Sequence, residues 1–308
     1  MIAAPAPTLA AAPNPRQGIA AFAAQASFEA TRLADGDLEA LRGFPSCRRV
    51  YVSAVPARPP QAQIDVACRL AAAGVEPVPH LAVRAFASGA ALDSHLARLV
   101  EGAGVRRVLV IGGDLAIRAG PFKAAIELIE SGLLQARGIV EIGIAGYPDG
   151  HPRIGPDELH RALAEKIAAA EATGLAVDIV TQFCFDARTI LDYVARLRAF
   201  GFDHPMRAGL AGPASLSSLL RYASRCGVRA SAQALAQRAG LIRQVFAMAV
   251  PDDLIRSLAD AAPAHVSVHF FSFGGLGGTA RWAQAVADAR IAIERDSGFR
   301  VVSPQREG

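Results

Sequence analysis

The sequence contains no hydrophobic run of the roughly 18 residues that a membrane-spanning helix needs. Its longest apolar stretches, such as residues 108–111, have the length of β-strands. The first 15 residues are rich in alanine and proline and lack the basic start and apolar core of a secretory signal. We therefore expect no membrane contact and a cytoplasmic protein.

Cysteine is scarce and widely spaced. The four cysteines stand at positions 47, 68, 184 and 226, and no two of them form a CxxC pair. This spacing indicates neither a zinc site nor a disulfide framework. We expect no bound metal, and unpaired thiols fit a reducing cytoplasm.

Neither sign of charge dominates, because 32 Lys and Arg residues stand against 28 Asp and Glu residues, a formal net charge of +4. The arginines are scattered along the chain rather than gathered in a stripe, so we do not expect a nucleic-acid partner. A mildly basic surface suits an anionic small molecule equally well. The oligomeric state is left open, with a homo-oligomer as one option.

Short β-rich runs alternate with longer segments of helical spacing. The predicted strands are residues 26–30, 49–54, 76–82, 106–111, 139–145, 177–181, 206–210 and 266–271. A predicted helix follows each of them, at residues 37–43, 61–73, 90–103, 121–132, 156–173, 187–200, 215–226 and 280–296. Such alternation predicts parallel strands with right-handed crossovers, and eight units favour a closed (β/α)₈ TIM barrel over an open sheet.

No linker divides the chain. We expect a flexible arm rich in alanine and proline over residues 1–22 and a single barrel domain over residues 23–308. The seventh unit is the longest, and two extra helices are predicted before the eighth strand, at residues 233–248 and 251–261.

Polar and aromatic residues stand where the predicted strands end, and the active sites of such barrels form at these C-terminal ends. Structural roles are open for three of them: Glu29 as an exposed carboxylate, His80 as a core histidine and Asp114 as a helix cap. Because nearly every predicted strand places such a residue at the same face of the barrel, we expect these residues to form one binding site. They are Glu29, Ser53, His80, Gly112, Gly113, Asp114, Tyr147, His151, Gln182, His269, Phe271 and Phe273.

Six segments resemble, in order and spacing, the methylenetetrahydrofolate reductase family. They are SFE (27–29), EPVPHL (76–81), GD (113–114), AGYPDGHP (145–152), TQFCFD (181–186) and HFFSF (269–273). The resemblance implies an FAD-dependent oxidoreductase that interconverts 5,10-methylenetetrahydrofolate and 5-methyltetrahydrofolate, with NAD(P)H, preferably NADH, as electron donor. It also implies a role in one-carbon metabolism and methionine biosynthesis.

The resemblance further implies roles for individual residues. Glu29 would be the general acid, with its pKa raised by an apolar surrounding. Asp114 would tune the flavin and contact the folate. The folate would also contact Gln182, Leu216, Phe271 and Phe273. The flavin would contact Ser53, His80, Gly112, Gly113, Tyr147 and His151, with Glu158 and Lys166 as candidates for its ribose and diphosphate.

The chain departs from the family pattern at several positions. Gly112 stands where an arginine is common, Leu216 stands nearest to a usual phenylalanine, and residues 274–278 are a glycine-rich run. Two alternatives stay open: the departures at Gly112 and Leu216 favour the first, and the presence of Glu29, Asp114 and Gln182 disfavours the second. One is a flavin-independent reductase, and the other is a non-catalytic folate-binding barrel that partners a methyltransferase.

Overall fold

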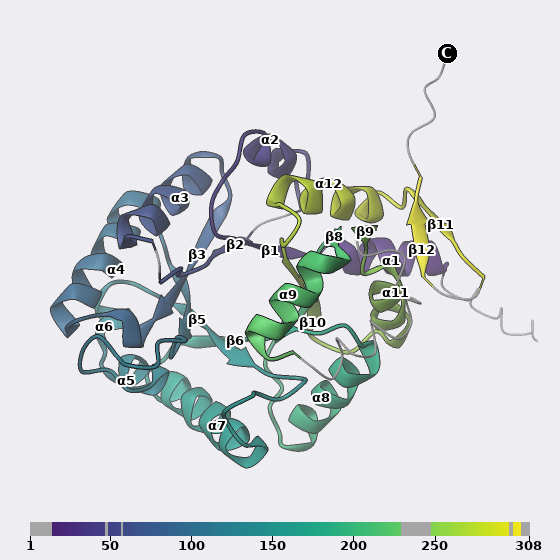
Figure 1. Cartoon of the computed structure of the whole chain (residues 1–308). Coiled ribbons are helices and arrows are strands. Elements are labelled where there is room, and N and C mark those ends of the chain that lie inside the picture. Colours follow the sequence, from purple (N-terminus) through teal and green to yellow (C-terminus); the bar gives the residue numbers. More distant parts are fainter. Residues whose placement is uncertain (1–13, 47–48, 57, 229–247, 296–297, 303–308) are drawn as a thin grey trace, which may run out of the picture.

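A computed structural model describes residues 14–46, 49–56, 58–228, 248–295 and 298–302. Eight parallel strands form a closed barrel in the order β1-β10-β7-β6-β5-β4-β3-β2 (Figure 1). Their bounds are β1 Ser27–Ala30, β2 Arg49–Val52, β3 Glu76–Ala82, β4 Arg107–Ile111, β5 Glu141–Gly146, β6 Ala176–Phe183, β7 Met206–Ala211 and β10 Val266–Phe271. The predicted TIM barrel and its eight strands are confirmed.

Helices surround the barrel, as the periodicity predicts. They are α2 Asp37–Arg42, α3 Pro60–Ala72, α4 Gly89–Ala103, α5 Ala125–Glu130, α6 Leu133–Ala136, α7 Pro156–Ala172, α8 Ala187–Ala199, α9 Leu216–Cys226, α11 Asp252–Ala261 and α12 Leu276–Ala287; a 3₁₀ turn, η1, spans Val83–Ala85. None of the described helices is both long and apolar enough to cross a bilayer.

Two predicted helices differ from those observed. The helix expected at 121–132 is shorter in the structure, where α5 covers only Ala125–Glu130. Gly132, with a left-handed φ of 74°, then separates α5 from the short helix α6. The helix expected at 280–296 begins one turn earlier and ends at Ala287. The chain then forms an antiparallel pair, β11 Ile291–Ile293 with β12 Phe299–Val301.

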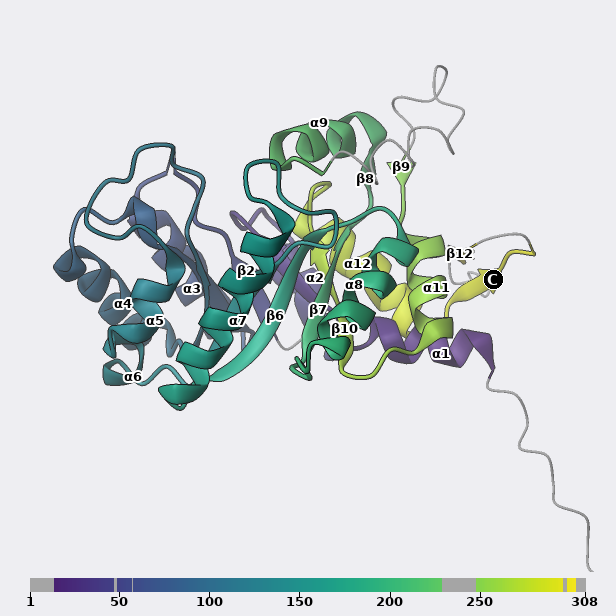
Figure 2. The ribbon, with the colours of Figure 1, turned by 90° about the horizontal axis from the view of Figure 1, so that it is seen from below.

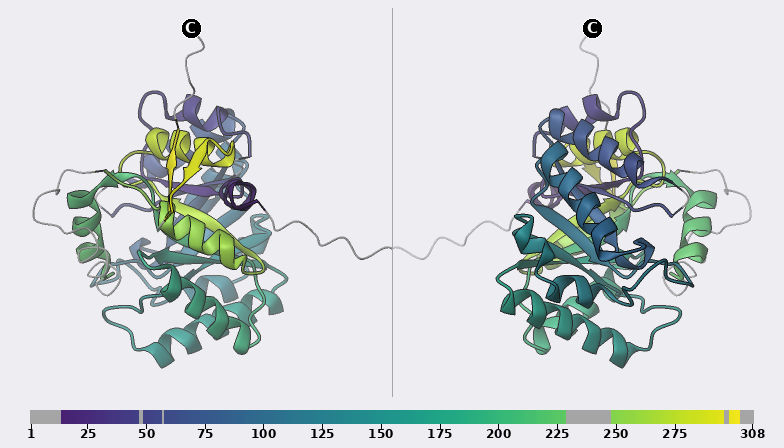
Figure 3. Two further views of the ribbon diagram at one scale, coloured as in Figure 1. Left: turned by 90° about the vertical axis from the view of Figure 1, so that its right-hand side faces the viewer. Right: turned by 90° about the vertical axis from the view of Figure 1, so that its left-hand side faces the viewer.

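The insertion between β7 and β10 contains α9, α11 and a short antiparallel pair, β8 Ala214–Ser215 with β9 Met248–Ala249. The extra helix expected at 251–261 is confirmed as α11. The one expected at 233–248 lies almost wholly outside the described residues. Helix α9 lies across one end of the barrel, as two perpendicular directions of view show (Figures 2 and 3).

The start of the described chain is a helix, α1 Pro15–Ala23, within the stretch where an arm was expected. Asn14 caps it, and its apolar residues Ile19, Phe22 and Ala23 are buried against α11 and α12. This packing places α1 beside the β11–β12 pair at one edge of the barrel (Figures 1 and 3). Residues 1–13 lie outside the described part.

Alternate strand residues point into the barrel, where they form layers. The middle layer is an apolar cluster of Tyr51, Val78, Leu109 and Val180. The next inward-pointing residues towards the strand starts form an ionic layer, which the sequence analysis did not predict. This ionic layer consists of Arg49, Glu76, Arg107, Glu141, Asp178 and Arg207.

The ionic layer crosses the barrel interior. Arg49 on β2 donates to Glu141 on β5 at 2.8 Å, although two strands stand between them. Arg107 donates to the same carboxylate at 2.7 Å, and Arg207 donates to Asp178 at 2.5 Å. Because each of these carboxylates has an arginine partner, the charges are compensated at the lower end of the barrel.

Candidate active site

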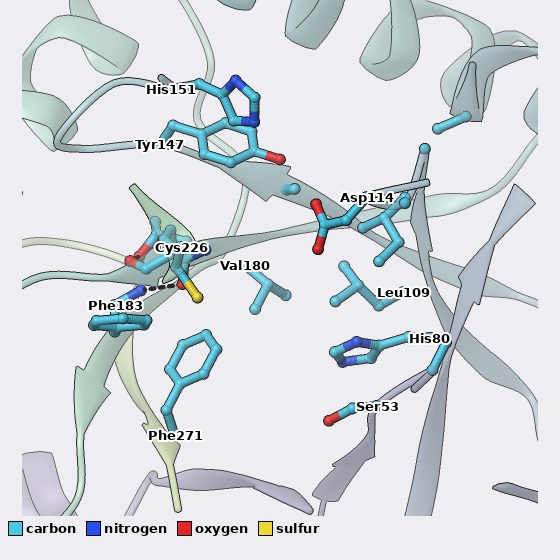
Figure 4. Close-up of a pocket in the computed structure, with 18 of the residues that line it drawn as sticks. Ser53, His80, Leu109, Asp114, Tyr147, His151, Val180, Phe183, Cys226 and Phe271 are labelled. Atoms are coloured by element: carbon cyan, nitrogen blue, oxygen red, sulfur yellow. Dashed lines mark hydrogen bonds between the residues drawn. The ribbon is translucent and has the colours of Figure 1, made fainter. Parts of the chain in front are cut away.

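A cavity of about 1780 Å³ opens at the C-terminal ends of the strands (Figure 4). Leu109 and Val180 of the apolar middle layer form its floor. Single small-molecule pockets occupy about 300–1,000 Å³, so this cavity has room for more than one ligand. Every residue to which the family resemblance assigns a role lines it except Leu216, which is buried at the start of α9.

Glu29 is the last but one residue of β1 and faces two histidines from other strands. Its Oε1 accepts a 2.6 Å hydrogen bond from Ser53 Oγ. Its Oε2 lies 3.6 Å from Nε2 of His269 and 3.9 Å from Nε2 of His80. Both of these Nε2 atoms are buried without a hydrogen-bond partner. On the far side of the His269 ring, Nδ1 lies 3.0 Å from the hydroxyl of Ser27.

The expected raised pKa of Glu29 is wrong for this geometry. Burial does raise it, but the His80 and His269 imidazoles and the Ser53 hydroxyl outweigh burial, and the net pKa is lowered. Burial also lowers the pKa of both histidines. The three groups are close enough to titrate together, so protons are shared among them.

Gln182 reaches the cavity through a β-bulge. Between Val180 and Phe183, β6 has one more residue than β7 has opposite it. A Cβ on Gly209 would lie 2.5 Å from the carbonyl oxygen of Thr181 and 2.8 Å from that of Gln182. Only glycine therefore lets β7 pass this close. Bulges of this kind redirect a side chain next to active sites.

An aromatic wall lies on the β6, β10 and α9 side of the cavity. Phe183 contacts Phe271 and Phe273 edge to face, with ring centroids 5.3 and 4.9 Å apart. Tyr222 of α9 stacks on Phe273 at 4.2 Å. This wall of Phe183, Phe271, Phe273 and Tyr222 offers flat apolar faces that suit a planar heterocycle.

The loop after β5 lies on another side of the cavity (Figure 4). Tyr147 and His151 contact each other edge to face, with ring centroids 5.2 Å apart. Asp114 ends the Gly112-Gly113 turn after β4; its side chain is 96% exposed and lies 4.0 Å from Arg153. Its carboxylate is therefore accessible to a ligand rather than engaged as a helix cap.

Helix α9 partly covers the cavity. Tyr222, Arg225 and Cys226 line the cavity from above. At the end of the helix, Gly227 packs so closely on Pro152 that a Cβ would lie 2.5 Å from the Pro152 ring. Burial raises the pKa of Cys226 to about 11, so this thiol is protonated at neutral pH.

Helix α7 contributes Glu158 and Lys166, and both line the cavity. Eight residues separate them, which corresponds to about 12 Å along the helix. Burial lowers the pKa of Lys166. The two side chains are therefore too far apart along the helix to contact one small group together.

Sequence reasoning assigned no individual role to two residues that the structure brings to the site, His269 and Arg84. The position of His269 two residues before Phe271 on the last strand is a signal that it points inward. Arg84 follows the third strand by two residues and lies beside Gly112. The pairing of β3 with β4 explains why Arg84 and Gly112 are close, but the sequence alone gives no sign of this contact.

Two glycines of the run at 274–278, Gly274 and Gly277, are closely packed, whereas a Cβ at Gly275 or Gly278 would meet nothing within 4 Å. A Cβ on Gly274 would lie 2.1 Å from the carbonyl oxygen of Pro213, and Gly277 donates to Asp37 at 2.8 Å. The run thus joins α12 to the β7 loop and to α2. Within the described residues, no group of His, Cys, Asp or Glu side chains could hold a metal ion.

Comparison with known proteins gives one family and several solved structures. A family model described as methylenetetrahydrofolate reductase matches residues 59–268. A dihydropteroate synthase from Thermus thermophilus is 14% identical, with 86% of this chain and 92% of that chain covered and a TM-score of 0.46.

Two further structures are a D-hydantoinase and a dihydropyrimidinase from Brevibacillus agri. Each is 12% identical over 57% of this chain, with a TM-score of 0.34. The match spans only 41% of the length of either enzyme. At these identities the similarity concerns the fold alone.

Proposed function

The chain belongs to the methylenetetrahydrofolate reductase family, and from this premise we propose an FAD-dependent enzyme that interconverts 5,10-methylenetetrahydrofolate and 5-methyltetrahydrofolate with NAD(P)H as electron donor. One observation carries the proposal. Glu29, held by Ser53 and flanked by His80 and His269, faces a cavity that also contains Gln182 and the aromatic wall. A pterin would use all three features: an acid that donates a proton, an amide that forms hydrogen bonds and flat apolar faces on which its ring stacks.

The residues present fit a flavin dinucleotide. The cavity is larger than a single small ligand requires, Gly112 and Gly113 leave backbone exposed to a close approach, and Tyr147 and His151 present ring edges. Ser53, His80, Asp114, Tyr147 and His151 would hold the flavin, with Glu158 and Lys166 further along. Bound FAD would supply the hydride-carrying chemistry, which no side chain offers.

Glu29 performs the proton transfer in this proposal. The amine nitrogen of the methylene bridge leaves poorly unless it is protonated, so an acid within reach of the pterin accelerates ring opening. The net pKa of Glu29 is lowered in the protein without ligand, but burial raises it, and a pterin that covers the carboxyl would strengthen that effect. Gln182 and the aromatic wall orient the pterin towards that oxygen.

The visible spectrum of the purified protein tests the proposal. We expect the absorbance of oxidised flavin, bleached anaerobically by NADH and restored by methylenetetrahydrofolate. A colourless protein that takes up no FAD yet oxidises NADH with methylenetetrahydrofolate would replace the proposal with a flavin-independent reductase. Folate binding without any NADH oxidation would replace it with a non-catalytic barrel. The same protein in a one-carbon auxotroph tests the assignment to methionine biosynthesis.

A further inference from the structure

Arg84 brings a positive charge to the part of the cavity beside Gly112 and Gly113, two residues of the β4 loop without side chains. It lies in η1, directly after β3, and lines the cavity. Its Nη2 donates to the carbonyl of Ala116 at 3.0 Å, and its Nε has no hydrogen-bond partner. No carboxylate in the described part of the chain forms an ion pair with it. The guanidinium is therefore fixed in place but not neutralised.

The loop after β4 wraps around Arg84. The backbone N–H of Arg84 donates to Gly112 at 3.1 Å, and its carbonyl accepts from Ala119 at 2.8 Å. With the Ala116 bond, three contacts hold both the backbone and one end of the side chain. A charge held in this way loses little conformational entropy when it binds a ligand.

The backbone next to the guanidinium is bare. A Cβ on Gly112 would lie 4.0 Å from Cδ of Arg84, so the arginine stem fills the space beside this glycine. Gly113 has φ of +91°, which only glycine adopts readily. Lys123, later in the same loop, also lines the cavity. Fixed cationic groups beside exposed backbone are the usual elements of a phosphate site.

The position of Arg84 distinguishes between the ligands of the cavity. Arg84 follows β3, the strand of His80, whereas Gln182 belongs to β6. Figure 4 shows His80 and Asp114 on one side of the cavity and Phe183 and Phe271 of the aromatic wall on the other. Resting on the proposed function, we infer that Arg84 binds a phosphate group of the dinucleotide cofactor, not the folate. Arg84 thereby supplies from β3 the positive charge that Gly112 does not supply from β4.

Isothermal titration of Arg84→Met with FAD, riboflavin and NADH tests this site without measuring turnover. Methionine keeps most of the stem and removes the charge. Loss of one charge-assisted hydrogen bond weakens binding by about 10- to 100-fold. We expect that loss for FAD and none for riboflavin, which has the same ring system and no phosphate. Arg118→Met is the matched control, because Arg118 is an exposed arginine of the β4 loop that wraps around Arg84, and it does not line the cavity.

The three ligands separate the outcomes. Weaker binding of NADH with unchanged FAD would support the phosphate site and assign it to the nicotinamide nucleotide. An equal loss for riboflavin and FAD, or no loss for any ligand, would overturn the inference while leaving the proposed function intact. A wild-type protein that binds none of the three would overturn both.

Discussion

The Nε2 atom of His269 lies 3.6 Å from Oε2 of Glu29, while Nδ1 of the same ring lies 3.0 Å from Oγ of Ser27. One imidazole thus stands between an acid at the cavity surface and a hydroxyl inside the barrel. His269 is fully buried, so its ring cannot exchange protons directly with bulk water. Any effect of His269 on a ligand in the cavity would therefore act through the Glu29 carboxyl.

Glu29→Gln removes the proton donor and keeps the size and the Ser53 contact. We expect the folate step to slow by about 10²–10⁴-fold, the range of general acid catalysis, while flavin reduction by NADH keeps its rate. Stopped-flow measurement of the two half-reactions gives each rate separately. Equal losses in both steps would contradict the acid role.

His269→Asn removes an imidazole that lowers the pKa of Glu29. Without it, the carboxyl keeps its proton to higher pH, so we expect the folate step to stay active to a pH about one unit higher. The measurement is the pH profile of that half-reaction.

His204→Asn is the control for this variant, because His204 pairs with Glu171 on the outer surface at 3.1 Å. A purely structural role of His269 would lower the rate at every pH and leave the profile where it is. That outcome would remove His269 from the proton-sharing group.

Gly209→Ala places a Cβ against the backbone of the β6 bulge, within 3 Å of the carbonyl oxygens of Thr181 and Gln182. We expect a loss of stability of about 1–3 kcal/mol and a larger loss of folate affinity than of flavin affinity, because Gln182 is redirected. Denaturant titration and ligand titration measure the two effects.

Gly18→Ala is the matched control, since nothing lies within 4 Å of a Cβ there and the residue is inside helix α1. This change is expected to stabilise the protein by about 0.5–1 kcal/mol. If Gly209→Ala were equally well tolerated, the bulge would not depend on this glycine.

His95 links stability to pH outside the catalytic group. It is buried on α4, its Nε2 lies 2.8 Å from the Gln63 side chain, and burial lowers its pKa to about 4. Between pH 6.5 and 4 the unfolded chain binds a proton here that the folded chain does not. The free energy of unfolding therefore falls as the pH falls, by up to about 1.4 kcal/mol per pH unit for this group.

Urea titrations of the wild type and of His95→Gln at pH 7.5, 6.0 and 5.0 check this linkage. We expect the variant to show a shallower dependence on pH than the wild type. The remaining slope would come mainly from His80 and His269, whose pKa values burial also lowers. Identical slopes would mean that His95 is protonated in the folded protein.

The eight strands were predictable because each is a short β-rich run closed by polar or glycine residues, and helical spacing follows. The loop after β4 was not predictable at its end, since residues 121–124 have a composition that helices also use and were expected to be helical. In the structure that loop is held by Arg84, and Gly120 packs against the backbone of Phe86, so the helix begins only at Ala125. Such constraints come from a neighbouring strand.

The site residues were predictable from barrel topology, because strand ends meet at one face. The sign of the Glu29 pKa was not, since it depends on two histidines from β3 and β10 that the linear sequence keeps apart. Gln182 was predictable from the sequence segment around it. The bulge that directs its side chain depends on Gly209, which belongs to another strand.

The ionic layer has a consequence for how ligands exchange. Together with the apolar layer above it, it closes the lower end of the barrel, so the cavity has its entrance at the strand C-termini, under α9. Every ligand of the cavity must then arrive and depart on the same side. A substitution that narrows the opening beneath α9 would therefore slow the exchange of every ligand, because the lower end of the barrel offers no second route.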